Sequence, residues 1–514
     1  MKKIYPVFIT VLCLTGALKA QNGYRIQVNF KGCTDSNLFI ARYFWDQVPL
    51  MDSCKRIKNG KVEFKGDMAL DNGVYLLVNQ NKNSFYCQFI VDKNQNFTIN
   101  LNASDISGTL RSPDDKQNDE FFSYVRFVSQ KNKEMSDFAN NLKGKPDSAA
   151  KVGEKQLVLD KEVKNFDAEF LKRNKGLFVN ELMGLKAEHY APSVPAGADE
   201  QAYKYYYYRD HYFDAVNFKD DRVICTPFFA DKIKRYVNQL TPQHPDSIIK
   251  AMDRILMQCE PGSTMFNTLV GHFTYKYETD KAMSFDQYGK SNTMEKVFIH
   301  LADKYIISGK TNGYYSDETV KKIKERVDIL RNLLPGAMVP DFYAIDTANG
   351  DRVRRMGFDT ATTSGGATYL YNKNAAELNQ LFKKLYDVKA KYTILVFWAE
   401  DCGHCQTEVP KLSEDLKAVK GKIDFKVFAV QTKDELYKNW KKFIVEKKLT
   451  DFIHVFDPVH VNNLKERFDI QGTPVIFLLD KEKRIIGKKL ATENVVDILN
   501  KLEEIEKNAK KNTN

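Results

Sequence analysis

Residues 391–430 read KYTILVFWAEDCGHCQTEVPKLSEDLKAVKGKIDFKVFAV and decide the fold of the C-terminal third of this 514-residue chain. TILVFW, residues 393–398, is a continuous apolar run, which is typical of a strand buried on both faces. IDFKVFAV, residues 423–430, predicts a second buried strand, and the amphipathic segment 406–420 between the two runs predicts a helix. The stretch therefore predicts a βαβ unit.

The motif Cys402-Gly403-His404-Cys405 stands where the first strand turns into the helix, which is the context of a redox-active pair. Spacing of i, i+3 on an opening helical turn brings two sulfurs within bonding range. The helix N-terminus offers free N–H groups and partial positive charge, and both favour the nucleophilic thiolate at Cys402. Cys405, one turn deeper, can attack a mixed disulfide and release the partner. A metal site would need further ligands, which this segment lacks.

Downstream, Gly472-Thr473-Pro474 precedes the apolar strand VIFLLD at 475–480. A trans proline there would spoil the ladder of the sheet, so the position predicts a cis Thr473–Pro474 turn beside the two cysteines. KEKRII, residues 481–486, predicts a hairpin, and 494–507 predicts a final amphipathic helix.

FWAEDCGHC together with GTPVIF resembles the thioredoxin superfamily, in particular the exported thiol–disulfide oxidoreductases of the TlpA/ResA type, over residues 336–510. The resemblance implies that Cys402 is the attacking thiolate and that Cys405 is the resolving thiol. It also implies that Pro474 faces the disulfide and that Thr473 presents backbone groups to a substrate strand. Trp398, with Phe397, would pack beneath the active turn.

The segment 336–353 is similar to the added N-terminal hairpin of that subfamily, with Asn349-Gly350 as its turn. A predicted helix at 374–388 then separates this hairpin from the active strand, and the resemblance gives it no role.

Two residues near the motif depart from thioredoxin itself. Val396 replaces a buried aspartate that assists proton transfer from the inner thiol, so another base, Glu408 or water, must serve. Asp401 precedes the first cysteine in place of tryptophan, and its carboxylate would oppose thiolate formation if it faced Cys402.

The dipeptide Gly403-His404 is that of protein disulfide isomerase, and a histidine there can stabilise the thiolate and make the disulfide more oxidising. The motif alone favours isomerase or oxidase activity. The TlpA/ResA resemblance favours a reductase, and we expect the reductase or isomerase direction.

The rest of the chain predicts a multidomain protein of α+β and α/β class. Short alternating strands over 21–110 predict an antiparallel β-sandwich or barrel, and three-to-four spacing of apolar residues over 115–335 predicts a helical domain. Residues 336–514 form the predicted thioredoxin-like α/β domain. The first two segments resemble domains of unknown function that precede such modules in secreted bacterial proteins.

Residues 1–20 show the basic start, apolar core and small final residue of a secretory signal peptide, which predicts a protein of the periplasm or cell envelope after cleavage. The apolar run at 4–18 is too short for a stable membrane span. The net charge of +11 is spread without a dense basic block, so nucleic-acid binding is not indicated. Pairing remains open for five further cysteines: Cys33, Cys54, Cys87, Cys225 and Cys259.

The leading hypothesis is an exported thiol–disulfide oxidoreductase that acts on protein thiols and disulfides, needs no cofactor and draws electrons from an unidentified donor. The alternative is an envelope binding or assembly protein with an accessory thioredoxin-like domain. A thiol peroxidase is a third interpretation, because PDF at 340–342 also occurs in that relative. A peroxidase would instead want a reactive cysteine with nearby Thr and Arg.

Overall fold

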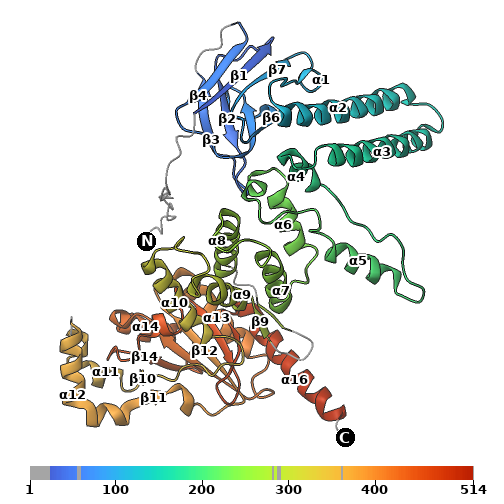
Figure 1. Ribbon diagram of the computed structural model, residues 1–514. Helices are drawn as coiled ribbons and strands as arrows, with labels where there is room; N and C mark the ends of the chain where they lie inside the picture. Colours follow the sequence, from blue (N-terminus) through green and yellow to red (C-terminus); the bar gives the residue numbers. More distant parts are fainter. Residues whose placement is uncertain (1–22, 55–58, 280–282, 286–290, 361–362, 513–514) are drawn as a thin grey trace. The chain divides into compact units, whose positions relative to one another are not determined.

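The computed structural model describes residues 23–54, 59–279, 283–285, 291–360 and 363–512 (Figure 1). Contacts divide the chain into two compact units, one of residues 1–241 with 258–260, and one of residues 242–257 with 261–514. This division falls inside the helical domain expected at 115–335. The domain boundaries that the sequence predicts near residues 110 and 335 therefore stay predictions. The signal peptide expected at 1–20 lies outside the described residues.

The first unit begins with seven strands in two sheets of order β4-β1-β7 and β3-β2-β5-β6. On β1, Ile26, Val28 and Phe30 are buried and alternate with more exposed residues, as the period-two pattern predicts. The strands are β1 Tyr24–Lys31, β2 Leu38–Arg42, β3 Leu50–Cys54, β4 Lys61–Gly66, β5 Gly73–Val78, β6 Phe85–Val91 and β7 Asn96–Asn102.

Helices complete this unit. Asp115 begins α2 by accepting a hydrogen bond from the Asn118 N–H at 2.8 Å. Phe127 of α2 and Phe166 of α3 stack with ring centroids 3.9 Å apart, which joins these two helices along their length (Figure 1). The helices are α1 Ile106–Thr109, α2 Lys116–Leu142, α3 Ser148–Arg173, α4 Phe178–Gly184, α5 Glu200–Asp210, η1 Asp221–Cys225 and α6 Phe229–Asn238.

The second unit opens with helices. Ser316 caps α10 by accepting from the Thr319 N–H at 3.2 Å. The elements are α7 Pro245–Leu256, α8 Thr264–Thr279, β8 Met283–Phe285, β9 Ser291–Thr293, α9 Glu295–Leu301, the π-helix η2 Ala302–Ile307 and α10 Asp317–Arg331.

A seven-stranded mixed sheet of order β11-β10-β14-β13-β12-β15-β16 follows. β12 pairs in parallel with β13 and antiparallel with β15, and all seven residues of β12 are buried, as its apolar run predicts. The strands are β10 Tyr343–Asp346, β11 Phe382–Lys384, β12 Tyr392–Trp398, β13 Phe425–Gln431, β14 Ile453–Phe456, β15 Val475–Leu479 and β16 Ile485–Lys488.

Both faces of this sheet are covered. One apolar cluster contains Trp398 together with residues of α13, α14 and α16, whereas Phe397 belongs to a second cluster with Phe342 and Phe468. The helices are α11 Gly350–Arg354, η3 Phe358–Thr360, α12 Ser364–Leu381, η4 Leu385–Asp387, α13 Gly403–Leu416, η5 Asp434–Leu436, α14 Tyr437–Glu446, α15 Leu464–Arg467, η6 Thr492–Asn494 and α16 Val495–Asn512. These observations confirm the fold class predicted from the sequence, except that β1 pairs with β7 in parallel within the β domain that was expected to be antiparallel.

Two local predictions before the active strand are wrong. Asn349-Gly350 is not a hairpin turn, because Asn349 has φ −100° and Gly350 begins α11. A Cβ at Gly350 would lie 2.4 Å from the Tyr437 hydroxyl, so close packing explains this glycine. The helix expected at 374–388 is α12, which starts earlier because Thr363 caps it and ends where Phe382–Lys384 pairs with β10.

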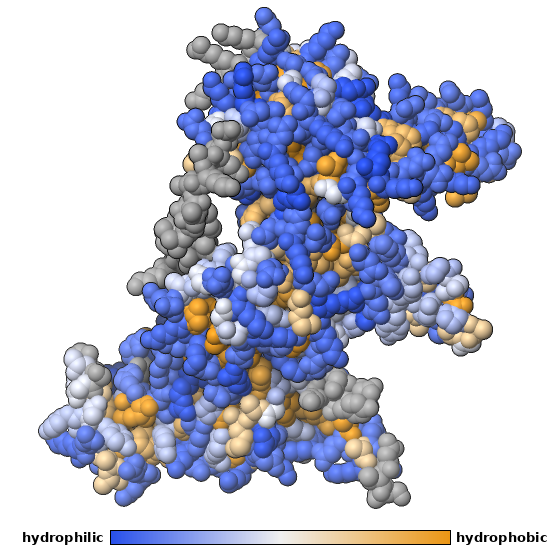
Figure 2. All heavy atoms as spheres, in the orientation of Figure 1, coloured by the Kyte–Doolittle hydropathy of each residue, from blue (hydrophilic) through white to orange (hydrophobic). Residues whose placement is uncertain are grey.

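No disulfide joins any of the seven cysteines within the described residues, including the five whose pairing the sequence leaves open. Among the helices that the structure describes, none is both long and apolar enough to cross a membrane. The face in view in Figure 2 is mostly hydrophilic, with apolar atoms in scattered patches.

Candidate functional site

The two cysteines of the motif open α13, directly after β12. Cys402 is the N-cap residue, with extended backbone angles of φ −84° and ψ 117°. Its sulfur accepts a hydrogen bond from the Cys405 N–H at 3.4 Å, the place that a Ser or Asp oxygen takes at an ordinary N-cap. The helix start therefore directs its N–H groups at the Cys402 sulfur.

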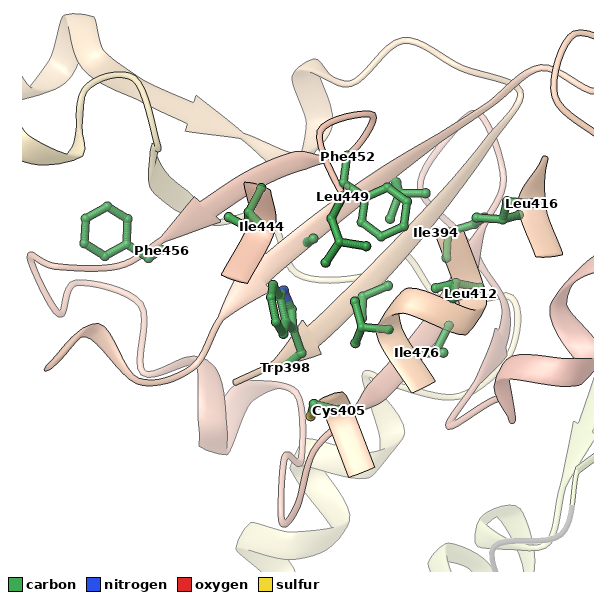
Figure 3. Close-up of a cluster of buried hydrophobic side chains, with 14 of the residues drawn as sticks. Ile394, Trp398, Cys405, Leu412, Leu416, Ile444, Leu449, Phe452, Phe456 and Ile476 are labelled. Atoms are coloured by element: carbon green, nitrogen blue, oxygen red, sulfur yellow. The ribbon is translucent and has the colours of Figure 1, made fainter. Parts of the chain in front are cut away.

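The two thiols differ in burial. Cys402 is half-buried, whereas Cys405 is fully buried in the apolar cluster that also holds Trp398 and Leu412 (Figure 3). Trp398 lies beneath the turn, with its ring 5.7 Å from Phe443 and 6.0 Å from His454. Phe397 points into the opposite cluster, so only Trp398 of the expected pair lies on the side of Cys405.

The segment before β15 reaches the site from the other side. The Cys402 thiol donates a hydrogen bond to the Thr473 carbonyl at 3.1 Å. The Thr473–Pro474 peptide bond is cis, the arrangement that the sequence predicts, and both residues are half-buried. The fold thus brings Thr473 against the motif from 71 residues away.

Burial and hydrogen bonding set the two thiol pKa values apart. Partial burial opposes ionisation of Cys402, but hydrogen bonds from the side chains of Thr473 and Cys405 and from the backbone of Cys405 and His404 outweigh it and lower its pKa. Burial raises the pKa of Cys405 to about 12. Cys402 is therefore the thiol that ionises first.

Gly403 and His404 lie exposed between the two thiols. A Cβ at Gly403 would meet no atom within 4 Å, so packing does not explain the glycine. His404 contributes its backbone N–H to Cys402, independently of its imidazole.

Asp401 has a charge partner of its own. Its carboxylate pairs with the Lys433 ammonium beyond the end of β13, and it is not among the largest influences on the pKa of Cys402. Because Lys433 compensates its charge, the opposition to thiolate formation that the sequence suggests is weakened.

Glu400 is a buried carboxyl that sequence reasoning missed. One of its oxygens accepts from the Gln431 amide of β13, and the other has no hydrogen-bond partner. Burial, the largest influence, raises the pKa of Glu400. Glu408, the base suggested by the sequence, is half-buried on α13. The sequence signal that could have identified Glu400 is its position just after the buried strand β12.

Three family models match the chain. Residues 374–488 match the AhpC/TSA family, residues 24–121 a domain of unknown function named DUF4369, and residues 151–332 a domain of unknown function named DUF5106. No curated protein matches the chain.

Solved structures of bacterial proteins are similar to this chain. A domain of a possible thiol-disulfide isomerase from Cytophaga hutchinsonii is 32% identical, over 34% of this chain and 97% of that one, with a TM-score of 0.25. The thioredoxin domain of a thiol-disulfide oxidoreductase from Bacteroides vulgatus is 26% identical over the same shares, with a TM-score of 0.24. A thioredoxin-like protein from Bacteroides caccae is 16% identical, over 61% of this chain and 98% of that one, with a TM-score of 0.41.

Proposed function

Since the C-terminal region of this chain belongs to the thioredoxin-like AhpC/TSA family, we propose that the protein is an exported thiol–disulfide oxidoreductase that exchanges disulfides with protein cysteines. The proposal rests mainly on the difference in burial and in pKa between Cys402 and Cys405. Cys402 caps a helix, is accessible and has a lowered pKa, whereas Cys405 is buried with a pKa of about 12. An attacking thiolate and a resolving thiol need this difference.

In the reducing direction, the Cys402 thiolate attacks one sulfur of a substrate disulfide. A mixed disulfide forms, and the other substrate sulfur leaves as a thiolate that takes up a proton. Cys405 then gives up its proton and attacks the Cys402 sulfur, which closes the Cys402–Cys405 disulfide and releases the second substrate thiol. Two electrons pass to the substrate, so an upstream dithiol donor must restore the pair.

The supporting residues act on this exchange in different ways. Thr473 and Pro474 would receive an extended substrate segment, because Thr473 already contacts the attacking sulfur. Gly403 and His404 would tune the couple, and Trp398 would keep the inner side of the turn dry. Glu408, three residues after Cys405 on α13, and the buried Glu400 are carboxyls that could accept the Cys405 proton.

We place the protein in the periplasm or cell envelope and favour the reductase or isomerase direction. The signal-peptide pattern of residues 1–20 supports export. The His404 motif argues for a couple more oxidising than thioredoxin, which suits isomerisation as well as reduction.

A second candidate function, an envelope binding or assembly protein, is supported by the extent of the two domains of unknown function that precede the redox region. In that case the thiol pair would be accessory. A Cys402→Ser variant would then keep partner binding while losing exchange activity.

Insulin reduction in the presence of dithiothreitol tests the proposal. We expect the wild type to accelerate precipitation of the insulin B chain, and Cys402→Ser and Cys405→Ser to lose this acceleration. Cys87→Ser, which removes a buried thiol of β6 in the first unit, is the matched control and should keep this acceleration. Equal acceleration by Cys402→Ser and the wild type would refute the proposed function.

A further inference from the structure

Five charged side chains form a continuous, largely buried cluster within the second unit: Glu295, Arg326, Asp469, Lys488 and Lys489. Lys488 pairs with one oxygen of Glu295, and the other oxygen lies 3.2 Å from Nζ of Lys489. Nζ of Lys489 lies 2.8 Å from the Asp469 carboxylate, which also accepts hydrogen bonds from Nη1 and, at 3.2 Å, from Nη2 of Arg326. Positive and negative groups alternate along the cluster.

This charge cluster lies largely inside the fold and is not a set of surface ion pairs. The side chains of Glu295, Asp469 and Lys488 are only 4%, 3% and 3% exposed. A buried charge costs several kcal/mol unless it is paired. Glu278, 3.8 Å from Nε of Arg326, is the further acid beside the cluster. Burial alone would raise the pKa of Asp469, but Arg326 and Lys489 hold it below the usual range.

The cluster joins two parts of the chain that are distant in sequence. Glu295 of α9 and Arg326 of α10 lie within residues 151–332, the match to DUF5106. Asp469 lies within the AhpC/TSA match, as does Lys488, and Lys489 follows directly. Ser291 adds a hydrogen bond to the Ile486 carbonyl of β16. Each part would bury unpaired charge without the other.

Asp469 also begins the loop that reaches the redox pair. Its backbone has φ 52°, in the left-handed region that non-glycine residues adopt uncommonly and Asp more often than most. Its carboxylate accepts from the Gln471 amide at 3.2 Å. Gln471 and Gly472 are otherwise exposed, and the next residue, Thr473, accepts the Cys402 hydrogen bond. Phe468, 4.8 Å from Phe397, anchors the same end of the loop.

We propose that Arg326 and Glu295 are positioning residues of the redox pair, which act through Asp469 to hold the loop 469–473 so that Thr473 lies against Cys402. Helices α9 and α10 of the DUF5106 match would then help to position the thiol site and would not form a functionally separate module. The inference rests on the proposed function only in taking Cys402 as the reacting thiol.

Two substitutions that remove charges of opposite sign distinguish a positioning role from a through-space electrostatic effect on Cys402. Arg326→Ala removes a positive charge and Asp469→Asn a negative one, so a through-space effect would move the Cys402 pKa in opposite directions. Loss of the anchor instead frees the whole loop, and with it both the Thr473 side chain that favours the thiolate and the Thr473 carbonyl that favours the thiol, so both variants should move that pKa in the same direction. Arg331→Ala is the matched control, because Arg331 lies on the same helix and pairs with exposed Asp303 and Asp328.

The measurement is the pH profile of iodoacetamide alkylation of Cys402 in the reduced full-length chain, read by peptide mass spectrometry. We expect shifts of about half a pKa unit or more in the same direction in both variants, roughly a threefold change in thiolate below the midpoint, and rescue by Arg326→Lys. Opposite shifts, or an Arg326→Ala profile equal to that of Arg331→Ala, would overturn the inference. If the wild type failed to reduce insulin while these shifts appeared, the proposed function would fail and the positioning role would stand.

Discussion

The Cys402 thiol donates to the Thr473 carbonyl across 3.1 Å, so the loop before β15 and the start of α13 form one site. A carbonyl can accept from the protonated thiol but offers nothing to a thiolate. On ionisation the sulfur must therefore depend on the N–H groups of His404 and Cys405 and on the Thr473 side chain. The site thus binds the two protonation states of Cys402 through different groups.

Alkylation should distinguish the two thiols. The pKa of Cys402 is lowered while that of Cys405 is about 12, and each pKa unit is a tenfold difference in thiolate at a pH below both values. We expect iodoacetamide at pH 6–7 to modify Cys402 at least about tenfold faster than Cys405 in the reduced protein. Faster modification of Cys405 would reverse the assigned roles.

The reduction potential should depend on the backbone at position 404. Proline there lacks the N–H that His404 offers to Cys402, and it is tolerated in a first helical turn. We expect His404→Pro to make the couple more reducing by about 30–90 mV, or roughly 1.4–4 kcal/mol. The control His404→Ala keeps the N–H and should shift the potential less. Equilibration against glutathione measures all three, and equal potentials for the wild type and His404→Pro would exclude this tuning.

Glu400 should make stability pH-dependent. Its folded pKa is raised above the ordinary value of 4.5, so the folded state binds the proton more tightly than the unfolded state. Stability should then fall as pH rises from about 4.5 through the folded pKa, and remain lower above it. We expect Glu400→Gln to lack this decline and to unfold a few degrees higher at pH 7. Glu414→Gln, an exposed carboxylate on α13, is the control in thermal scans, and unchanged profiles for both variants would contradict the prediction.

Lys488→Met should destabilise the second unit. The substitution leaves Glu295 buried with Lys489 as its remaining cation, and breaking a buried pair costs about 3–5 kcal/mol. We expect a loss near the lower end of that range in urea unfolding followed by the fluorescence of Trp398 and Trp440. Lys417→Met, at an exposed ion pair, should cost less than about 1 kcal/mol. Equal losses would show that the cluster is not stabilising.

The active half of the sheet could be predicted because its signals are local. β12 is a fully buried apolar run, α13 begins at the cysteine motif, and Thr473-Pro474 directly precedes β15. These features follow from hydrophobic pattern and spacing alone. The start of α12 and the edge strand β11 were misjudged, because pairing of Phe382–Lys384 with β10 overrode a helical pattern.

The charged parts of the site could not be predicted, since their partners are far away in the sequence. Arg326 and Asp469 are 143 residues apart, and in a hairpin Lys488 and Lys489 read as solvent-exposed lysines. From the sequence, the Asp401 carboxylate was expected to disfavour the Cys402 thiolate, but in the fold Lys433 pairs with this carboxylate. Which charged side chains pair with one another depends on which residues the fold brings together.

Trapping with Cys405→Ser is the most direct test of the central claim, that Cys402 attacks and Cys405 resolves. Without the resolving thiol, we expect mixed disulfides between Cys402 and protein substrates to accumulate and to disappear on treatment with dithiothreitol. Cys402→Ser should trap nothing under the same conditions. Equal trapping by Cys402→Ser, or no mixed disulfide with Cys405→Ser, would contradict the account.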